Sequence, residues 1–186
     1  MAATAVSAKA LTLGQGPALL EVFLEPTCPF SVRAFNKLDG LISLMGEDQL
    51  TVKIYLQSQP WHMFSGVITR AILAALTLPE GNTAALKILK AVGEHREEFE
   101  FTDHCRGPNM DATPQQILER LEKYSGISVS QPFDKPELQQ LIKWHCKYSR
   151  QNGIHVSPTF MINGLIQADM GSGEEISQWA ERIRKG

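Results

Sequence analysis

The sequence predicts an α/β protein with a mixed β-sheet and a large all-helical insertion. Two apolar runs rich in strand-forming residues, 19–24 and 50–56, flank a segment with helical spacing. Two shorter apolar runs surround Asn163-Gly164, a dipeptide typical of a tight β-hairpin turn. Residues 60–151 show helical periodicity and no strand signal. Because strands follow these residues again, we interpret them as an insertion into the sheet-forming part.

The elements before the insertion form a βαβ unit with one additional strand. Residues 10–13 are a candidate edge strand, and residues 19–24 are expected to be a buried strand. A helix is predicted from Cys28 to about Met45. Residues 50–56 alternate apolar and polar side chains and are β-branched in part, which predicts a strand. The two long strands of a βαβ unit are parallel, and the crossover between them is right-handed.

Four helices are expected within the insertion, and a fifth closes the chain. The four helices cover approximately residues 63–72, 85–92, 113–121 and 134–151. The third opens with a capping box at Thr113, followed by proline in the first turn. The closing helix is expected to be capped by the box Ser172 to Glu175 and to bury one stripe of apolar residues: Ile176, Trp179, Ala180 and Ile183. Residues 1–8 are expected to be disordered, and residues 9–59 and 152–186 to form the sheet-containing domain.

Composition and charge argue against nucleic acid or a membrane as partner. The 186 residues are 43% hydrophobic and 20% charged, with a formal net charge of −2. This charge offers no electrostatic basis for binding nucleic acid or an anionic membrane. The first ten residues lack the apolar core of a signal peptide, and no apolar stretch has membrane-spanning length. We therefore expect a cytoplasmic protein.

The cysteines indicate neither a disulfide framework nor a metal site. Cys28, Cys105 and Cys146 are too few and too far apart for a framework, and they fit a reducing compartment. The pairs His104-Cys105 and His145-Cys146 contain the residue types that bind zinc. However, no Cys-x-x-Cys or His-x-x-x-His spacing accompanies them, so no metal is expected.

Cys28 is the candidate nucleophile, because it follows a buried strand and opens a helix. The free N–H groups and positive dipole end of a helix N-terminus stabilise a thiolate, the reactive form of cysteine. Thr27 is the expected N-cap, and Pro29 is compatible with the first turn. A dithiol motif needs a second cysteine three residues on, where this chain has Ser31. The Ser31 hydroxyl either hydrogen-bonds the Cys28 sulfur or is an ordinary polar group of the first turn.

Two segments resemble the DsbA-like branch of the thioredoxin superfamily. One is strand–TCPFS–helix at residues 27–31, and the other is VSPTFMING at residues 156–164. In that family a cis-proline opens the strand that faces the active cysteine, and Pro158 matches it in position and context. The resemblance covers residues 10–184 in element order and implies a thioredoxin-like fold with thiol–disulfide oxidoreductase or isomerase activity. Ser31 departs from the redox members, and monothiol glutaredoxins and kappa-type glutathione enzymes show a similar change.

The resemblance also implies a substrate-binding surface around Cys28. Pro29 and Phe30 would contact the substrate beside the cysteine. The backbone of Ser157, before Pro158, would pair with an extended polypeptide or with glutathione. The alternative for Pro158 is an ordinary proline at the first residue of a strand, where no ladder donor is needed.

Three further titratable residues are candidates for acid–base work near Cys28. His62 follows the second long strand, so it is expected at the same sheet end as Cys28. It could lie near the thiolate or protonate the leaving thiol, and the alternative is packing beside Trp61. Glu21 matches the buried acid that thioredoxin relatives often carry, whereas Glu25 is expected to be the more exposed of the two acids.

The leading hypothesis is a monothiol thiol–disulfide oxidoreductase or isomerase with Cys28 as nucleophile. Its partners would be thiol or disulfide substrate proteins, with glutathione as co-substrate and no bound cofactor. One alternative is a glutathione-dependent transferase or isomerase of the kappa type. Another is a redox-silent binding module that holds a partner across Ser157 and Pro158.

Overall fold

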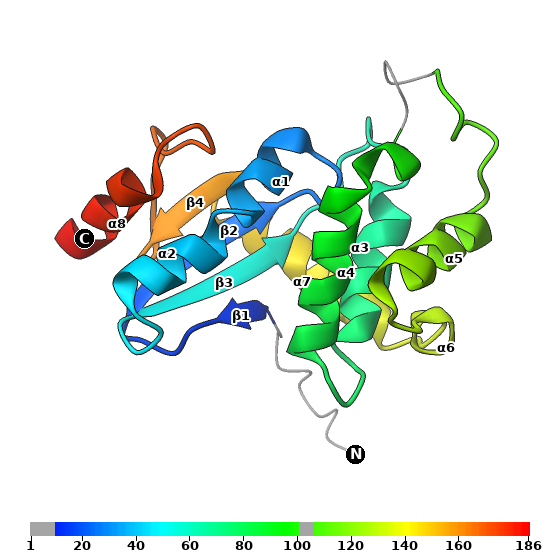
Figure 1. The fold of residues 1–186 in the computed structure, drawn as a ribbon, viewed down its shortest axis with the longest axis horizontal. Coiled ribbons are helices and arrows are strands. Elements are labelled where there is room, and N and C mark those ends of the chain that lie inside the picture. The colour runs from blue at the N-terminus through cyan, green and yellow to red at the C-terminus, as the bar shows by residue number, and fades with distance from the viewer. Residues whose placement is uncertain (1–9, 101–105) are drawn as a thin grey trace.

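The computed structural model describes residues 10–100 and 106–186, which form a mixed sheet with helices on both faces (Figure 1). The strands are β1 (Leu11–Leu13), β2 (Ala18–Leu24), β3 (Leu50–Leu56), β4 (Thr159–Ile162) and β5 (Leu165–Ile166). Within the described residues their order across the sheet is β1-β3-β2-β4-β5. β2 and β3 are parallel, and β1 and β4 pair with them antiparallel. The predicted α/β class, the parallel pair and the β1 edge strand are confirmed.

The hairpin is confirmed as well, and its turn residues explain it. β4 and β5 pair antiparallel on either side of Asn163 and Gly164. Both residues have positive φ angles, 49° and 83°, as a two-residue hairpin turn requires. Asparagine and glycine tolerate this backbone region better than other residues, so the dipeptide determines where the chain reverses.

The helices of the described residues are α1 (Pro29–Phe35), α2 (Leu38–Met45), α3 (Ser65–Ala75), α4 (Asn82–Glu94), α5 (Pro114–Ser125), α6 (Ser130–Phe133), α7 (Leu138–Gln151) and α8 (Ile176–Lys185), with a 3₁₀ turn, η1, at Arg96–Glu98. The four helices predicted in the insertion correspond to α3, α4, α5 and α7. The capping box at Thr113 is confirmed, because its hydroxyl accepts from the Gln116 N–H. α6 and η1 were not predicted, since each is too short to develop a period.

The predicted single helix from Cys28 to Met45 is wrong, because the chain breaks it into α1 and α2. At the break, the N–H of Lys37 donates to the carbonyl of Ala34, three residues back, instead of four. The ammonium group of Lys37 binds the carbonyls of Ser172 and Glu174. The apolar period continues through the break, with Ala34 and Leu38 both buried, so periodicity alone could not locate it.

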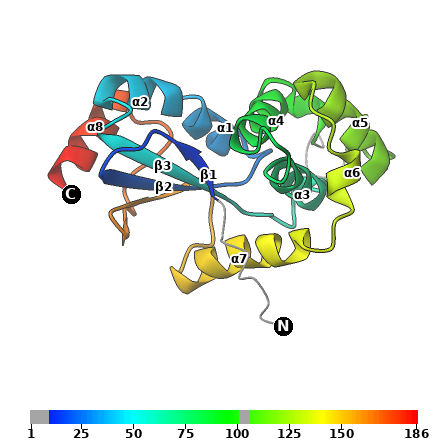
Figure 2. The same ribbon diagram turned by 90° about the horizontal axis from the view of Figure 1, so that it is seen from below.

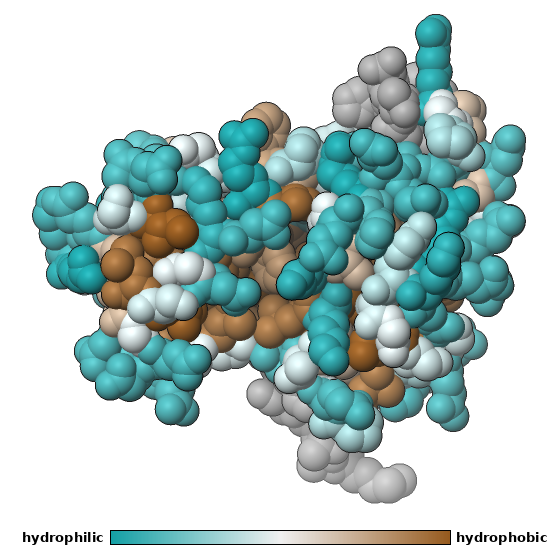
Figure 3. Space-filling view, in the orientation of Figure 1, coloured by the Kyte–Doolittle hydropathy of each residue, from teal (hydrophilic) through white to brown (hydrophobic). Residues whose placement is uncertain are grey.

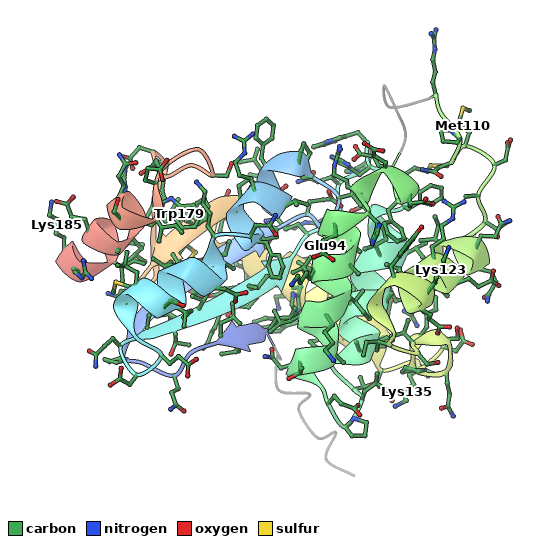
Figure 4. All side chains as sticks on the ribbon, in the orientation of Figure 1. Glu94, Met110, Lys123, Lys135, Trp179 and Lys185 are labelled. Carbon is green, nitrogen blue, oxygen red and sulfur yellow. The ribbon has the colours of Figure 1, made fainter. Side chains whose placement is uncertain are left out.

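The cap predicted for the last helix is also wrong, although its buried stripe is confirmed. The N-cap is Glu175, whose N–H donates to the Gln178 side chain in a capping box. Ser172 does not cap, because the Glu174 carboxylate holds the preceding loop by accepting from the Gly171 N–H. Trp179, labelled in Figure 4, is fully buried between α8 and the sheet.

Successive side chains of each strand point to opposite faces of the sheet, so the core has one part on each face. One face carries Leu20, Val22 and Leu24 of β2, and its cluster continues into α1–α5 and α8 and includes Leu141 of α7. The opposite face carries Phe23 and Tyr55, together with Ile154 and Met161, and packs against Trp144 and Tyr148 of α7. Figure 2 shows α7 on this second face and α1, α2 and α8 on the first. Helices of residues 60–151 therefore contribute to both sides of the core.

Glu21 lies on the α7 face and is almost fully buried, as the sequence suggested. Its carboxylate accepts a hydrogen bond of 2.7 Å from the Tyr148 hydroxyl. Burial, and then the neighbouring Glu21 carboxylate, raise the pKa of Tyr148 to about 12. The pKa of Tyr55 is raised by the same two causes. Both phenols are therefore held in the protonated form, and that of Tyr148 donates to Glu21.

Between neutral pH and pH 12, the free energy of unfolding is expected to fall less in Tyr148→Phe than in wild type. A phenol with a folded-state pKa above its unfolded value of about 10 stabilises the fold fully below that pH. This contribution disappears as the pH rises through about 12. The check is the urea midpoint of unfolding between neutral pH and pH 12. Tyr124→Phe on α5 is the matched control, and equal alkaline profiles for wild type and Tyr148→Phe would contradict the expectation.

Candidate functional site

Cys28 is the N-cap of α1, at the point where the chain leaves the carboxyl end of β2. Its φ and ψ of −67° and 125° are extended, and its side chain is 7% exposed. Thr27, predicted as the cap, is not the cap, because its hydroxyl is used inside the preceding turn. The Cys28 thiol points toward the carbonyl oxygen of Ser157, at 3.7 Å from the sulfur. The sulfur thus lies at a helix N-terminus, where N–H groups of the first turn favour a negative charge.

Ser157 and Pro158 face this sulfur from the loop that leads into β4. The peptide bond between them is cis. Because the Ser157 carbonyl contacts the thiol, the structure brings together the predicted site residues Cys28 and Ser157, which are 129 residues apart in sequence. Pro29 and Phe30 follow Cys28 on the surface, and both are exposed.

The turn before Cys28 is closed by Glu25, whose side chain is fully buried. The expectation that Glu25 would be the more exposed acid is therefore wrong. Its carbonyl accepts from the Cys28 N–H, and its carboxylate accepts from both the N–H and the hydroxyl of Thr27, at 3.0 and 2.9 Å. Pro26 fixes the turn that directs the carboxylate back onto Thr27. A Glu-Pro-Thr run, with donors two residues after the acid, is the local signal for this contact.

Ser31 is buried one helical turn after Cys28, on the side of the β2 terminus. Its hydroxyl accepts from the backbone N–H of Glu25 at 3.2 Å. The described partner of Ser31 is thus the turn before Cys28, in place of the Cys28 sulfur considered above. Three residues after Cys28, this chain carries a hydroxyl group that holds the backbone of that turn.

His62 reaches the same turn from the loop between β3 and α3, and it is 8% exposed. Its Nδ1 atom lies 3.0 Å from the Thr27 hydroxyl and 3.6 Å from a carboxylate oxygen of Glu25. With the Thr27 hydroxyl donating to Glu25, a hydrogen on Nδ1 is the assignment that fits, because the Thr27 oxygen at 3.0 Å and a Glu100 carboxylate oxygen at 3.1 Å can both accept from it. His62 is therefore at the predicted sheet end, and it contacts the turn through Thr27.

Two residues at this site, Arg96 and Glu100, were missed by sequence reasoning. Arg96 donates through Nε to the carbonyl of Thr27 at 2.6 Å, across 69 residues of chain. Its guanidinium also pairs with Glu100, which in turn lies 3.1 Å from Nδ1 of His62. The only sequence signal is the four-residue spacing of Arg96 and Glu100, which predicts a local ion pair and no contact with the cysteine turn.

Large apolar side chains are exposed on the segments that carry the site. We call Phe30, Trp61, Met63 and Val156 the apolar rim; each is more than half exposed. Phe30 follows Cys28 on α1, Trp61 and Met63 flank His62, and Val156 precedes Ser157. Exposed apolar residues gathered on neighbouring segments are typical of a surface that contacts another polypeptide.

The other cysteine in the described residues, Cys146, lies on α7 and is half-buried beside Ile142, as expected for a helix-face residue. Cys105 and His104 lie outside the described residues. His145 accepts from the backbone N–H of Leu56. No cluster of three or more metal-binding side chains occurs in residues 10–100 and 106–186. None of the described helices has the length and apolar character to cross a membrane.

Comparisons with solved structures show which proteins the chain resembles. It is 61% identical to a "putative protein-disulfide isomerase" from Pseudomonas syringae, with a TM-score of 0.92 over 94% of this chain and 98% of that one. The thiol-disulfide exchange protein α-DsbA2 from Wolbachia pipientis aligns with a TM-score of 0.69 at 16% identity, over 95% and 86% of the two chains. Oxidised BdbD from Bacillus subtilis aligns with a TM-score of 0.67 at 16% identity, over 94% of each chain. These last two support the fold alone. No family model and no curated protein matches the chain.

Proposed function

The chain belongs to the DsbA-like branch of the thioredoxin superfamily, and on that premise we propose that it is a thiol–disulfide oxidoreductase or isomerase acting through Cys28. One observation carries the proposal: the Cys28 thiol, at the N-terminus of α1, lies 3.7 Å from the carbonyl of Ser157. The contact supports a reactive sulfur beside a loop backbone with which an extended substrate could pair.

The proposed reaction uses one protein thiol. The Cys28 thiolate attacks one sulfur of a substrate disulfide, and the other substrate sulfur leaves as a thiolate. The resulting mixed disulfide is then attacked by a second thiolate, which takes over the bond and returns Cys28 to its reduced form. Because Ser31 cannot act as this second thiol, the resolving group is a thiol of the substrate itself or glutathione. When a substrate thiol attacks, the outcome is isomerisation. When glutathione attacks, its sulfur stays bonded to the substrate sulfur, and a second glutathione thiolate then releases it as oxidised glutathione and leaves the substrate reduced.

The apolar rim favours a polypeptide as the disulfide substrate, with glutathione as the co-substrate that regenerates Cys28. An unfolded or extended chain offers both apolar side chains for the rim and backbone groups for pairing beside Ser157. Glutathione has little apolar surface, so the rim adds little to its binding. The two substrates should therefore depend differently on the rim.

Trp61→Ala tests whether the polypeptide and glutathione substrates depend differently on the apolar rim. We expect it to slow the reactivation of a protein with scrambled disulfides about three- to tenfold, while reduction of a small glutathione mixed disulfide changes less than about twofold. Trp61 is exposed, so the fold should be unaffected. Leu44→Ala, which removes an exposed apolar side chain on α2, is the matched control.

Other results would favour the alternative functions. Equal losses on both substrates would contradict a polypeptide-specific rim. Conjugating or isomerising activity with glutathione that survives without any disulfide present would indicate a kappa-type enzyme. An unreactive Cys28 together with retained binding of peptides would indicate a redox-silent binding module.

A further inference from the structure

The helical insertion is connected to the Cys28 turn by charged side chains. Arg96 of η1 donates to the carbonyl of Thr27, the residue immediately before Cys28. The same guanidinium pairs with one oxygen of Glu100, and the other oxygen of Glu100 lies 3.1 Å from Nδ1 of His62. We call Arg96, Glu100 and His62 the insertion bridge. It contacts the turn at two points, the Thr27 carbonyl and the Thr27 hydroxyl.

The bridge lies largely out of contact with solvent, which distinguishes it from ordinary surface ion pairs. The side chains of His62 and Glu100 are 8% and 10% exposed, and that of Arg96 is 32% exposed. Charges in such surroundings are poorly screened by water and salt. A charge in the bridge therefore influences a neighbouring thiolate more than a solvated charge would.

The segment that carries the bridge is held in a fixed position. The Asn109 side chain donates to the carbonyls of both Glu97 and Glu100, at 2.6 and 2.7 Å. α4, which precedes η1, packs directly on α1, because a Cβ atom on Gly93 would lie only 3.0 Å from Val32. Figure 3 shows apolar residues in the hollow between the α1–α2 side of the molecule and α4. The insertion and the nucleophile-bearing helix thus form one packed unit.

The charges around Cys28 define what Arg96 contributes. Glu25 at the end of β2 and Glu100 after η1 place two carboxylates beside the turn, and a Cys28 thiolate adds a third negative charge. Arg96 supplies a permanent positive charge, and His62 presents its Nδ1 hydrogen. Arg33, the basic residue of α1, is placed over the Phe30 ring, 5.8 Å from its centroid. Without Arg96 the surroundings of the thiolate would be dominated by the two carboxylates.

We propose that Arg96 is a positioning residue through which the helical insertion sets the thiolate fraction of Cys28. Its guanidinium holds the turn at the Thr27 carbonyl and offsets the Glu25 and Glu100 carboxylates. This inference rests on the proposed function, in which Cys28 is the reactive thiol. The proposal assigns a role in the reaction to Arg96, a residue of the insertion. The motifs at residues 27–31 and 156–164 alone would not include Arg96 in the site.

The test measures the alkylation rate of Cys28 against pH, with peptide mass spectrometry to separate it from Cys105 and Cys146. Arg96→Ala should move the midpoint of the profile upward by at least about half a pH unit, an approximately threefold loss of rate below the midpoint. Glu100→Gln should move it downward, because a negative charge is removed. Arg96→Lys, which keeps the charge and loses the planar fork, should move it less than Arg96→Ala.

The control is Arg70→Ala, which removes an arginine that binds backbone carbonyls of Phe133 and Lys135 elsewhere in the insertion. It should leave the alkylation profile unchanged, and unfolding midpoints identify any loss of folding. Arg96→Ala and Glu100→Gln profiles that coincide with wild type, or move in the same direction, would overturn the inference. A wild-type Cys28 that reacts no faster than Cys146 would instead overturn the proposed function itself.

Discussion

Cys28→Ala is expected to reduce thiol–disulfide exchange by at least about a hundredfold, because it removes the proposed nucleophile. The fold should tolerate the change. As N-cap, Cys28 contributes no side-chain capping bond, and its thiol makes one weak hydrogen bond to Ser157. The free energy of unfolding should therefore change by no more than about 1 kcal/mol.

The measurement is turnover of a glutathione mixed disulfide and of a scrambled protein by the same preparations. Cys146→Ala is the matched control, since it removes the half-buried thiol of α7 and leaves the site intact. It should retain full activity. Activity that persists in Cys28→Ala and disappears in Cys146→Ala would identify Cys146 of α7 as the nucleophile. This result would contradict our account.

Ser31→Cys is expected to convert the site from a monothiol to a dithiol centre. Residues three apart on the first helical turn face the same side, and their separation suits a disulfide. After mild oxidation the variant should lose two hydrogen atoms to the oxidant by forming a disulfide between Cys28 and the thiol introduced at position 31. It should also gain the ability to oxidise a reduced protein. Wild type lacks this activity in our account, because Ser31 offers no thiol.

The same substitution should also lower stability. The Ser31 hydroxyl accepts from the Glu25 N–H, and a thiol is a weak acceptor, so we expect a loss of about 1 kcal/mol in the reduced variant. Ser31→Ala is the control, since it loses the acceptor without gaining a thiol. If Ser31→Cys accumulated a glutathione adduct and formed no internal disulfide, the proposed geometry of the site would be contradicted.

The parts of the fold that were predicted correctly are those in which local sequence determines structure. β3 coincides with the alternating run 50–56, and the hairpin reverses at Asn163 and Gly164 because few other residues accept those backbone angles. The division into α1 and α2 was missed because the break is accompanied by long-range contacts, those of Lys37 with the loop before α8. Such long-range contacts leave the apolar period unchanged.

The same distinction between local sequence and later contacts separates the predicted features of the site from those that were missed. The motif around Cys28 and the Ser157-Pro158 pair were recognisable in the sequence, and the structure brings them within contact. The burial of Glu25 was missed, because it depends on the side chain folding back onto Thr27. Arg96 and Glu100 were missed because only the packing of α4 on α1 brings them to the turn.

The central claim, that Cys28 is a single reactive thiol resolved from outside, is tested most directly by intact-mass spectrometry. Wild type and Cys28→Ala are incubated with oxidised glutathione at mildly acidic pH, where ordinary cysteines remain protonated. Our account predicts one glutathione adduct on wild type, with one equivalent of reduced glutathione released, and none on Cys28→Ala. The absence of an adduct on wild type, or the loss of two hydrogen atoms through a disulfide from Cys28 to Cys105 or Cys146, would contradict it.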